Sequence, residues 1–255
     1  MTDVLLEVRG LHRSFGGVKA LAGCTLDVIE GKINGLIGPN GSGKTTMFNI
    51  ITGYERCDEG DVLYRGSSIR NRTPEAIFAL GIGRTFQLTR IFGRLSVLDN
   101  MLVATQRNEV WLRSMLRPTG SASERAHAME LLDFVGLARL SGELAGSLSY
   151  GQRKLLELAY VLVADPQLIL LDEPAGGVNP SLINQLSGKI AELNQQGTTF
   201  LVIEHNMEFV MGLCHAVTVM SYGCVIAAGT PEVVRADPKV LDAYLGGTEE
   251  DEDES

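Results

Sequence analysis

The chain has 255 residues, of which 45% are hydrophobic and 21% are charged, a composition typical of a soluble globular protein with one large or two small domains. Its net charge of −9 argues against nucleic acid as the main ligand. Six acidic residues lie in the C-terminal TEEDEDES, and without them the charge is only −3. We therefore expect a near-neutral folded part and a disordered acidic tail over residues 247–255.

The cysteines and the apolar runs of the sequence indicate the cellular compartment of the protein. The four cysteines form neither a CxxC pair nor a zinc-binding spacing, which indicates free thiols in a reducing compartment. The N-terminal MTDVLLEVRG has acidic residues and lacks the apolar core of a signal peptide. No apolar run approaches the ~18 residues that span a bilayer. We expect a cytoplasmic protein, or one held at the cytoplasmic side of a membrane assembly.

The first part of the chain alternates predicted strands with turns, as β-like patterning and apolar runs bounded by glycine indicate. The predicted strands cover residues 5–10, 25–30, 33–38 and 61–66. A helix is expected from Lys44 to about Gly53. Thr73 followed by Pro74 predicts the start of another helix.

The middle of the chain, from about residue 88 to residue 162, is predicted to be helical. Residues 124–137 show helical spacing that stops at Gly136, and a second helix is expected over residues 150–164. Residues 107–123 have a mixed pattern and are expected to be partly loop.

Strand–helix alternation then returns. The predicted strands cover residues 167–174, 198–205, 216–220 and 224–229. Helices are expected to start at Asn179, Thr230 and Asp237, each of which precedes a proline. This alternation predicts an α/β fold with a mainly parallel sheet, of which the β-rich start and the helical middle form subdomains.

Residues 38–45 read GPNGSGKT, which fits the pattern G-x-x-x-x-G-K-[ST] between a buried strand and a helix. Glycines allow successive N–H groups to turn toward phosphate oxygens, and the helix N-terminus adds positive charge. Lys44 is expected to neutralise the β- and γ-phosphates, and the Thr45 hydroxyl to bind Mg²⁺. The residues expected to bind the triphosphate of ATP are Gly38, Pro39, Asn40, Gly41, Ser42, Gly43, Lys44, Thr45 and Thr46.

Two carboxylates, a histidine and a glutamine complete the candidate site. The apolar strand ending in Asp172 delivers that carboxylate to the sheet edge near the phosphates, where it is expected to hold Mg²⁺ through water. Glu173 points elsewhere and is the candidate to orient or deprotonate the attacking water. His205 could hydrogen-bond the γ-phosphate, whereas its neighbour Glu204 is assigned a structural role. Gln87 is placed to contact Mg²⁺ or water where the sheet meets the helical segment; alone, each of these residues would more often be structural.

The stretch SYGQ at residues 149–152 has the form of a capping box, with Ser149 as the N-cap and Gln152 three residues later. This helix start offers a second anion-binding end, far in sequence from the phosphate loop.

Together these motifs resemble those of the ATP-binding cassette (ABC) ATPases. GPNGSGKTT, Gln87, SYGQ, LILLDEP and His205 match that family's phosphate loop, Q-loop, signature, Walker B motif and switch histidine, in order, over about residues 4–246. The resemblance implies a P-loop NTPase fold in which a mainly parallel sheet carries an antiparallel β subdomain and an inserted α-helical subdomain at about residues 88–162. It also implies an ABC ATPase domain over residues 1–246.

The same resemblance implies that the signature of this chain acts on the ATP of a neighbouring molecule. In this family the signature caps the ATP held by an opposing subunit, so two ATP join a head-to-tail dimer and hydrolysis releases it. The residues implied in this role are Ser149, Gly151 and Gln152. Phe15 matches the aromatic residue that stacks on adenine, with Val18 near the ribose; the alternative for Phe15 is a place in the core.

Two positions depart from the commoner family pattern. Tyr150 replaces a glycine of LSGGQ, but Ser149 and Gly151 remain, so phosphate capping is expected to persist. Asn179, in AGGVNP, stands where many members have aspartate. It either acts across the dimer or caps the helix that Pro180 opens.

Longer stretches resemble the LivG-type ATPases of branched-chain amino-acid importers: RTFQLTRIFGRLSVLDNMLVA, EPAGGVNP, IEHNMEFVMGLCHAVTVMSYG and GTPEVVRADPKVLDAYLG. Urea and short-chain amide importers share this pattern. The resemblance implies a second ATPase subunit, two transmembrane permease subunits and a separate substrate-binding protein, with the ATPase peripheral at the cytoplasmic face of the membrane. Residues 88–98 are expected to receive a membrane subunit's helix, with Ile91 and Phe92 as apolar anchors or as core of the helical part.

Three other functional classes are alternatives. An exporter ATPase would carry the same motifs. Non-transport ABC ATPases of translation or DNA repair usually contain two cassettes or a long coiled coil, whereas this chain has one cassette, no heptads and no basic face. A nucleotide-binding module without hydrolysis conflicts with an intact Glu173.

Overall fold

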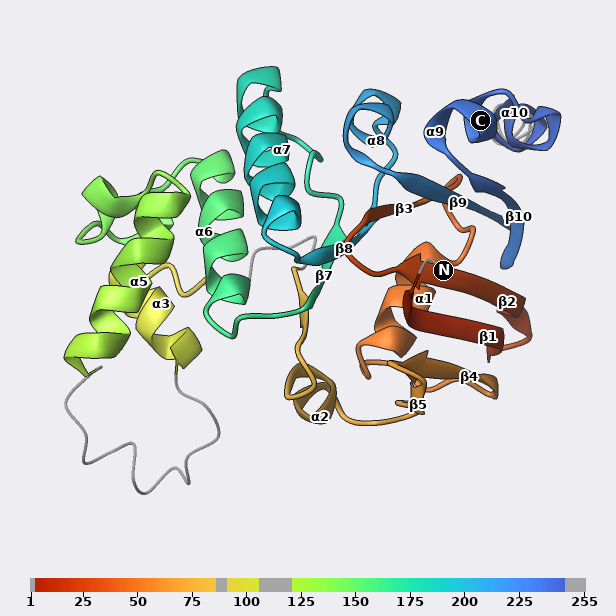
Figure 1. Ribbon diagram of the computed structural model, residues 1–255, viewed down its shortest axis with the longest axis horizontal. Coiled ribbons are helices and arrows are strands. Elements are labelled where there is room, and N and C mark those ends of the chain that lie inside the picture. The colour runs from red at the N-terminus through yellow and green to blue at the C-terminus, as the bar shows by residue number, and fades with distance from the viewer. Residues whose placement is uncertain (1–2, 86–90, 106–120, 246–255) are drawn as a thin grey trace.

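The computed structural model describes residues 3–85, 91–105 and 121–245. Two sheets form its frame, one with the strand order β2-β1-β4-β5 and one with the order β10-β9-β3-β8-β7-β6 (Figure 1). The strands are β1 (Val4–Phe15), β2 (Val18–Ile29), β3 (Ile33–Ile37), β4 (Glu59–Tyr64), β5 (Ser67–Ser68), β6 (Ile82–Arg84), β7 (Leu168–Asp172), β8 (Thr199–Ile203), β9 (Ala216–Ser221) and β10 (Cys224–Gly229).

Helices account for most of the other elements. They are α1 (Lys44–Ile51), α2 (Pro74–Phe78), α3 (Val97–Thr105), α5 (Ala122–Phe134), α6 (Tyr150–Leu162), α7 (Pro180–Gln195), α8 (Met207–Leu213), α9 (Pro231–Arg235) and α10 (Pro238–Leu245), with 3-10 helices η1 (Ala138–Leu140) and η2 (Ala145–Ser147). The predicted starts at Thr73 and Asn179 are confirmed, because each side chain accepts a hydrogen bond from a backbone N–H of the first turn. The sequence interpretation did not predict β5, β6 or α8, and it covered α3 only as part of the region from residue 88 to residue 162 that was expected to be helical.

The six-stranded sheet is mainly parallel, as predicted. All its neighbouring strands run parallel except the edge strand β10, which pairs antiparallel with β9. The four-stranded sheet is antiparallel throughout. The fold is therefore a parallel α/β core with an antiparallel β sheet beside it and helices α3, α5 and α6 at the other side (Figure 1).

Both faces of the six-stranded sheet are buried in separate apolar cores. On one face, Leu36 and Leu170 pack with α1 and the antiparallel sheet. On the other face, Ile37 and Leu171 pack with helices that include α6, α7 and α8. Successive residues of a strand point to opposite faces, so a strand covered on both sides is apolar at most of its positions. The helix α1 and the helix α6 consequently lie on opposite faces of this sheet.

In the parts of the chain that the structure describes, we find no helix that combines the length and the apolar character needed to cross a membrane.

Helices α6 and α7 are in close contact at their first turns. A Cβ atom on Gly151 would lie only 1.8 Å from Leu182 Cδ2, so a larger residue at this position would force the Leu182 side chain to move. We predict that Gly151→Ala lowers the free energy of unfolding by ~1–3 kcal/mol through overpacking, measured by urea denaturation.

The matched control for this prediction is Gly188→Ala, within α7. A Cβ atom on Gly188 meets nothing within 4 Å, so this change should be neutral or stabilising. In the double variant Gly151→Ala with Leu182→Ala, the loss in the free energy of unfolding should be smaller than the sum of the losses of the two single variants, because the shortened side chain removes the clash. Equal stability of the Gly151 and Gly188 variants would contradict the prediction.

Candidate functional site

The phosphate loop connects β3 to α1 and is pressed against two other strands. Gly38 and Gly43 have φ angles of 149° and 101°. A Cβ atom on Gly38 would lie 2.1 Å from Met220 O, and one on Gly43 would lie 2.4 Å from Ala20 O. Both positions therefore require glycine, and the ends of β9 and β2 fix the curve of the loop.

The first turn of α1 offers backbone donors. Its first hydrogen bond runs from Met47 N to Gly43 O at 2.9 Å, and Gly43 supplies no side-chain cap. The N–H groups of Lys44, Thr45 and Thr46 therefore precede the bonded part of the helix. Such groups at a helix N-terminus suit phosphate oxygens.

The Lys44 ammonium group lies within the loop. Its Nζ donates to the carbonyl oxygens of Gly38 and Pro39, both at 2.8 Å. Burial lowers the pKa of Lys44, and the negative charges of Glu173 and Asp172 act in the opposite direction. The structure thus brings the loop lysine and both predicted carboxylates together, although they are far apart in sequence.

Asp172 ends β7 and is paired with Arg84, the last residue of β6. Arg84 Nη2 lies 2.9 Å from Asp172 Oδ2, and both side chains are only 6% exposed. Arg84 Nη1 also donates to Asn49 Oδ1 at 2.8 Å and to Thr52 Oγ1 at 3.0 Å, at the end of α1. One guanidinium group therefore joins β6, β7 and α1 beside the phosphate loop.

The sequence interpretation did not identify Arg84 as a site residue. A signal was present, because an arginine in the apolar stretch GIGRTF, three residues before Gln87, is unlikely to be buried without a carboxylate partner. Which carboxylate it meets depends on the pairing of β6 with β7.

Glu173 follows β7 in a conformation that few non-glycine residues adopt. Its φ angle is 48°, and its N–H donates to Ile203 O at 3.0 Å. Glu173 Oε1 lies 3.9 Å from His205 Nδ1, and the His205 side chain is exposed. The predicted general base and the predicted γ-phosphate ligand therefore face each other at the carboxyl ends of adjacent strands, β7 and β8.

Glu204 has the structural role that the sequence interpretation assigned to it. Its carboxylate is fully buried and accepts hydrogen bonds from Ala175 N at 2.6 Å, His205 N at 3.0 Å and Asn206 N at 3.1 Å. It fixes the segment after Glu173 to the segment that carries His205.

The predicted adenine-binding residues lie at the end of the β1–β2 hairpin. Phe15 pairs with Val18 across the hairpin, and the Phe15 ring is 43% exposed, so Phe15 is not a core residue. The Arg13 guanidinium carbon lies 4.5 Å from the centre of the ring. Val18 is exposed as well, and Ala20 of the same strand abuts Gly43 of the phosphate loop. The adenine contact itself stays a prediction.

The signature forms the predicted capping box at the start of α6. Gln152 N donates to Ser149 Oγ at 3.3 Å, and Ser149 N donates to Gln152 Oε1 at 2.9 Å. Gly151 is buried against Leu182 of α7, which is a packing reason for glycine that the sequence interpretation did not foresee. The capping role of Asn179 is confirmed, because Asn179 Oδ1 accepts from Leu182 N at 3.0 Å; a role across a dimer is not tested by this contact.

Gln87 lies outside the described residues, as does the start of the expected membrane-subunit cleft at residue 88. Ile91 is partly buried against the apolar core of the helical side, which favours its interpretation as core. Phe92 is 51% exposed. The acidic tail is also outside the described residues.

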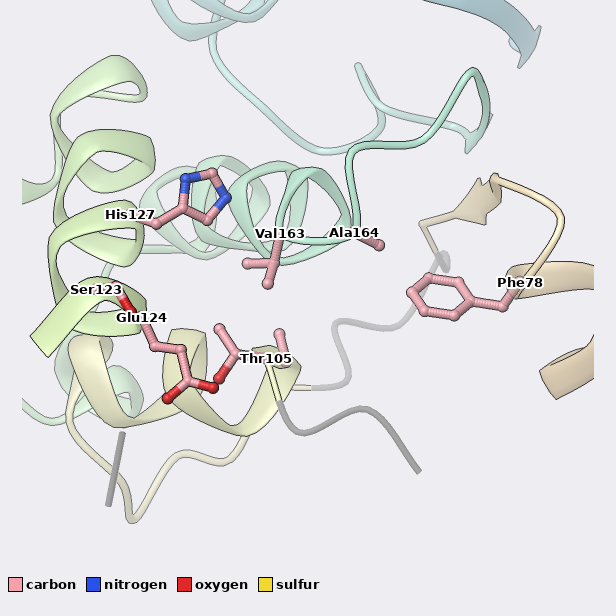
Figure 2. A pocket seen from close by; sticks show the side chains of 8 residues that line it. Phe78, Thr105, Ser123, Glu124, His127, Val163 and Ala164 are labelled. Atoms are coloured by element: carbon pink, nitrogen blue, oxygen red, sulfur yellow. The ribbon is translucent and has the colours of Figure 1, made fainter. Parts of the chain in front are cut away.

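A cavity of about 260 Å³ lies where α2 faces the helical side (Figure 2). Phe78 lies on one side of it, and Thr105, His127 and Val163 lie on the other, from α3, α5 and the end of α6. This cavity is separate from the charged groups around Lys44 and is lined by apolar and uncharged polar side chains together with Glu124 and His127.

Known proteins share this arrangement. A sequence profile described as "ABC transporter" matches residues 21–176, and one described as "Branched-chain amino acid ATP-binding cassette transporter" matches residues 224–250. The High-affinity branched-chain amino acid transport ATP-binding protein LivG of Escherichia coli (strain K12) is 40% identical over 253 residues, which cover 96% of this chain and 99% of LivG. A probable LivG of Archaeoglobus fulgidus is 38% identical over 95% of both chains.

Solved structures of ATP-binding cassettes are similar to this chain as well. The ADP conformation of an ATP-binding cassette of an ABC transporter has a TM-score of 0.87 and 36% identity over 96% of this chain and 100% of that chain. A nucleotide-free cassette from an ABC transporter has a TM-score of 0.86 and 35% identity, covering 95% of this chain and 99% of that chain.

A phosphate loop on a parallel sheet, with paired carboxylates at the adjoining strand end, defines a P-loop nucleotide-binding protein. The chain belongs to the ATP-binding cassette family of ABC transporters, and it is an ATPase.

We predict that Arg84→Met lowers the free energy of unfolding by ~3–5 kcal/mol, because it leaves the buried Asp172 carboxylate without its counter-charge. Urea denaturation measures this loss. The control is Arg65→Met, which removes the exposed pair of Arg65 with Glu30 and should cost less than ~1 kcal/mol. Equal losses in the free energy of unfolding of the two variants would show that the buried pair stabilises the fold no more than the exposed pair does.

Proposed function

We propose that this chain hydrolyses ATP to drive the import of branched-chain amino acids through membrane subunits. The similarity to LivG carries this proposal, because it extends over 96% of the chain at 40% identity. The second profile match, at residues 224–250, supports it independently, because β10, α9 and α10 lie outside the phosphate loop and the carboxylate strands that all cassettes share.

The triphosphate group would bind to the phosphate loop, from Gly38 to Thr46. The N–H groups at the start of α1 would donate to phosphate oxygens, and Lys44 would place its charge against the β- and γ-phosphates. The glycines that the packing requires at 38 and 43 fit such close approach of backbone to ligand.

Mg²⁺ would be held by the Thr45 hydroxyl and, through water, by Asp172, with Gln87 as a further contact. When bound, this ion neutralises the charge that develops on the phosphates. Within the described residues there is no group of three or more His, Cys, Asp and Glu side chains that could hold a metal ion. That finding fits a cation whose ligands are mostly phosphate oxygens, a hydroxyl and water. Arg84, bound to Asp172 Oδ2, would keep the other carboxylate oxygen turned to the ion.

Glu173 would accept the proton of the water that attacks the γ-phosphorus, and His205 would donate a hydrogen bond to the γ-phosphate. Their separation of 3.9 Å supports action on the same phosphate group. Phe15 would stack on adenine with its exposed ring, and Val18 would contact the ribose.

The signature residues Ser149, Gly151 and Gln152 would act on ATP bound to a second ATPase subunit, in a head-to-tail dimer around two ATP. The position of α6 supports this, because α6 and the phosphate-loop helix α1 pack on opposite faces of the six-stranded sheet. The Ser149 hydroxyl and the first N–H groups of α6, which form a capping box in this chain, would donate to a phosphate of the partner's ATP.

Two transmembrane permease subunits would dock on the face near residues 88–98, with a substrate-binding protein acting on the other side of the membrane. The exposed ring of Phe92 supports an apolar docking surface there. The chain would then lie peripherally at the cytoplasmic face of the membrane.

We predict that Glu173→Gln abolishes turnover, with at least a ~100-fold loss, and leaves ATP binding intact. The variant should accumulate as a closed dimer with ATP, which size-exclusion chromatography detects. Glu59→Gln, at a solvent-exposed carboxylate of β4, serves as a control and should keep full turnover. Near-normal turnover in Glu173→Gln would show that another group accepts the proton.

The complete transporter tests the substrate. In proteoliposomes with the membrane subunits and the substrate-binding protein, ATPase activity should rise severalfold when leucine, isoleucine or valine is added. Urea and acetamide are the matched alternatives. Stimulation by urea or acetamide alone would contradict branched-chain amino-acid import, while hydrolysis without any response to substrate-loaded binding protein would contradict import as such.

A further inference from the structure

The first turn of α6 lies beside the loop that follows Glu173 in the same chain. A Cβ atom on Gly177 would lie 3.5 Å from Tyr150 Cε1 and 4.0 Å from Tyr150 Oη. Gly177 has a φ angle of 69° and carries no side chain, and the ring lies where a side chain at this position would meet it. Tyr150 is 44% exposed.

The same helix start is also fixed to α7. Gly151, next to Tyr150, packs against Leu182, and Leu182 N donates to the side chain of Asn179, the N-cap of α7. The Tyr150 ring and the Gly151 backbone therefore contact the two ends of one short stretch, from Gly177 to Leu182. A shift of the signature must move this stretch or break both contacts.

The loop leads from Tyr150 to the reactive carboxylate. Gly176 N donates to Glu173 O at 3.1 Å, and a Cβ atom on Gly176 would lie 3.8 Å from Glu173 Oε2. Ala175 N donates to Glu204, whose carboxylate also holds the backbone N–H of His205. Glu173 and His205 are therefore part of the same hydrogen-bonded unit as the loop under the Tyr150 ring.

We propose that Tyr150 is a positioning residue that couples the two ATP sites of the dimer. This inference rests on the proposed function, in which Ser149 acts on the partner's ATP while Glu173 acts on the ATP of its own chain. Binding of the partner's phosphate at Ser149 fixes the start of α6, and the Tyr150 ring transmits that position to the loop and so to Glu173. Each subunit's base is thereby aligned only when the other site is filled.

The chemistry of the side chain fits this role. A glycine at position 150, the commoner residue in this motif, would leave the loop at Gly177 without its contact. The Lys154 ammonium lies 5.9 Å from the centre of the Tyr150 ring, on the next turn of α6, and favours one ring position. Coupling between sites of this kind is typically 5- to 150-fold.

The test compares Tyr150→Gly with Tyr150→Phe, which keeps the ring and removes only the hydroxyl. Both are measured in the full-length chain assembled with its membrane partners, as ATPase rate against ATP concentration. We expect Tyr150→Gly to lose about 10-fold in kcat and to lose cooperativity in ATP, and Tyr150→Phe to retain both. The Kd of the isolated chain for a fluorescent ATP analogue should stay within about twofold, because the ring does not contact that chain's own phosphate loop.

A second measurement is independent of turnover. In the Glu173→Gln background, hydrogen exchange is followed at the start of α6 and at residues 174–178 before and after ATP addition. With Tyr150 present, ATP should protect both segments; with Tyr150→Gly, it should protect only the start of α6. Global exchange and thermal unfolding show that the variant is folded.

Retention of cooperativity and loop protection in Tyr150→Gly would overturn the inference. So would equal losses in Tyr150→Gly and Tyr150→Phe, because the contact depends on the ring. These outcomes leave hydrolysis by the wild-type assembly intact, whereas a wild-type assembly that hydrolyses no ATP would overturn the proposed function and this inference with it.

Discussion

The buried ion pair between Arg84 and Asp172 is the interaction on which the site depends. A carboxylate at a sheet edge that is covered on both faces would lose its hydration, and the loss costs several kcal/mol without a counter-charge. Arg84 supplies that charge and is itself held by Asn49 and Thr52. Three elements that meet at the phosphate loop, namely β6, β7 and α1, are therefore fixed relative to one another, and the geometry needed around a triphosphate exists in the fold itself.

A second buried carboxylate, that of Glu204, organises the neighbouring strand end. Its three backbone donors come from both sides of the boundary between the loop after Glu173 and the segment that carries His205. The three hydrogen bonds satisfy a Glu204 carboxylate that is fully buried. The two side chains proposed to act on the γ-phosphate thus stand on one rigid support, while their own tips stay accessible.

The distribution of these parts over the sheet fits the proposal that the starts of α1 and α6 act on different ATP molecules. Helix α1 belongs to the core beneath the antiparallel sheet, and α6 belongs to the opposite core, with α7. One chain cannot readily direct both helix ends to one phosphate across a buried sheet. In the proposed function a partner in the reverse orientation resolves this, and the proximity of Tyr150 to Gly177 would couple each half-site to the other.

The sequence alone determined the local elements of this protein: the strand, glycine loop and helix from Ile33 to Ile51, the apolar strand that ends in Asp172, and the capping box at Ser149. Each depends on residues within a few positions of one another, so spacing and residue type suffice. Bulges in the pairing of β1 with β2 disrupt the alternation of side chains. The sequence pattern therefore did not reveal that β1 continues beyond its predicted end at residue 10. Only the tertiary structure decided that Arg84 meets Asp172, that Gly151 meets Leu182 and that Tyr150 lies on Gly177, because these partners become neighbours only after distant segments have paired and packed.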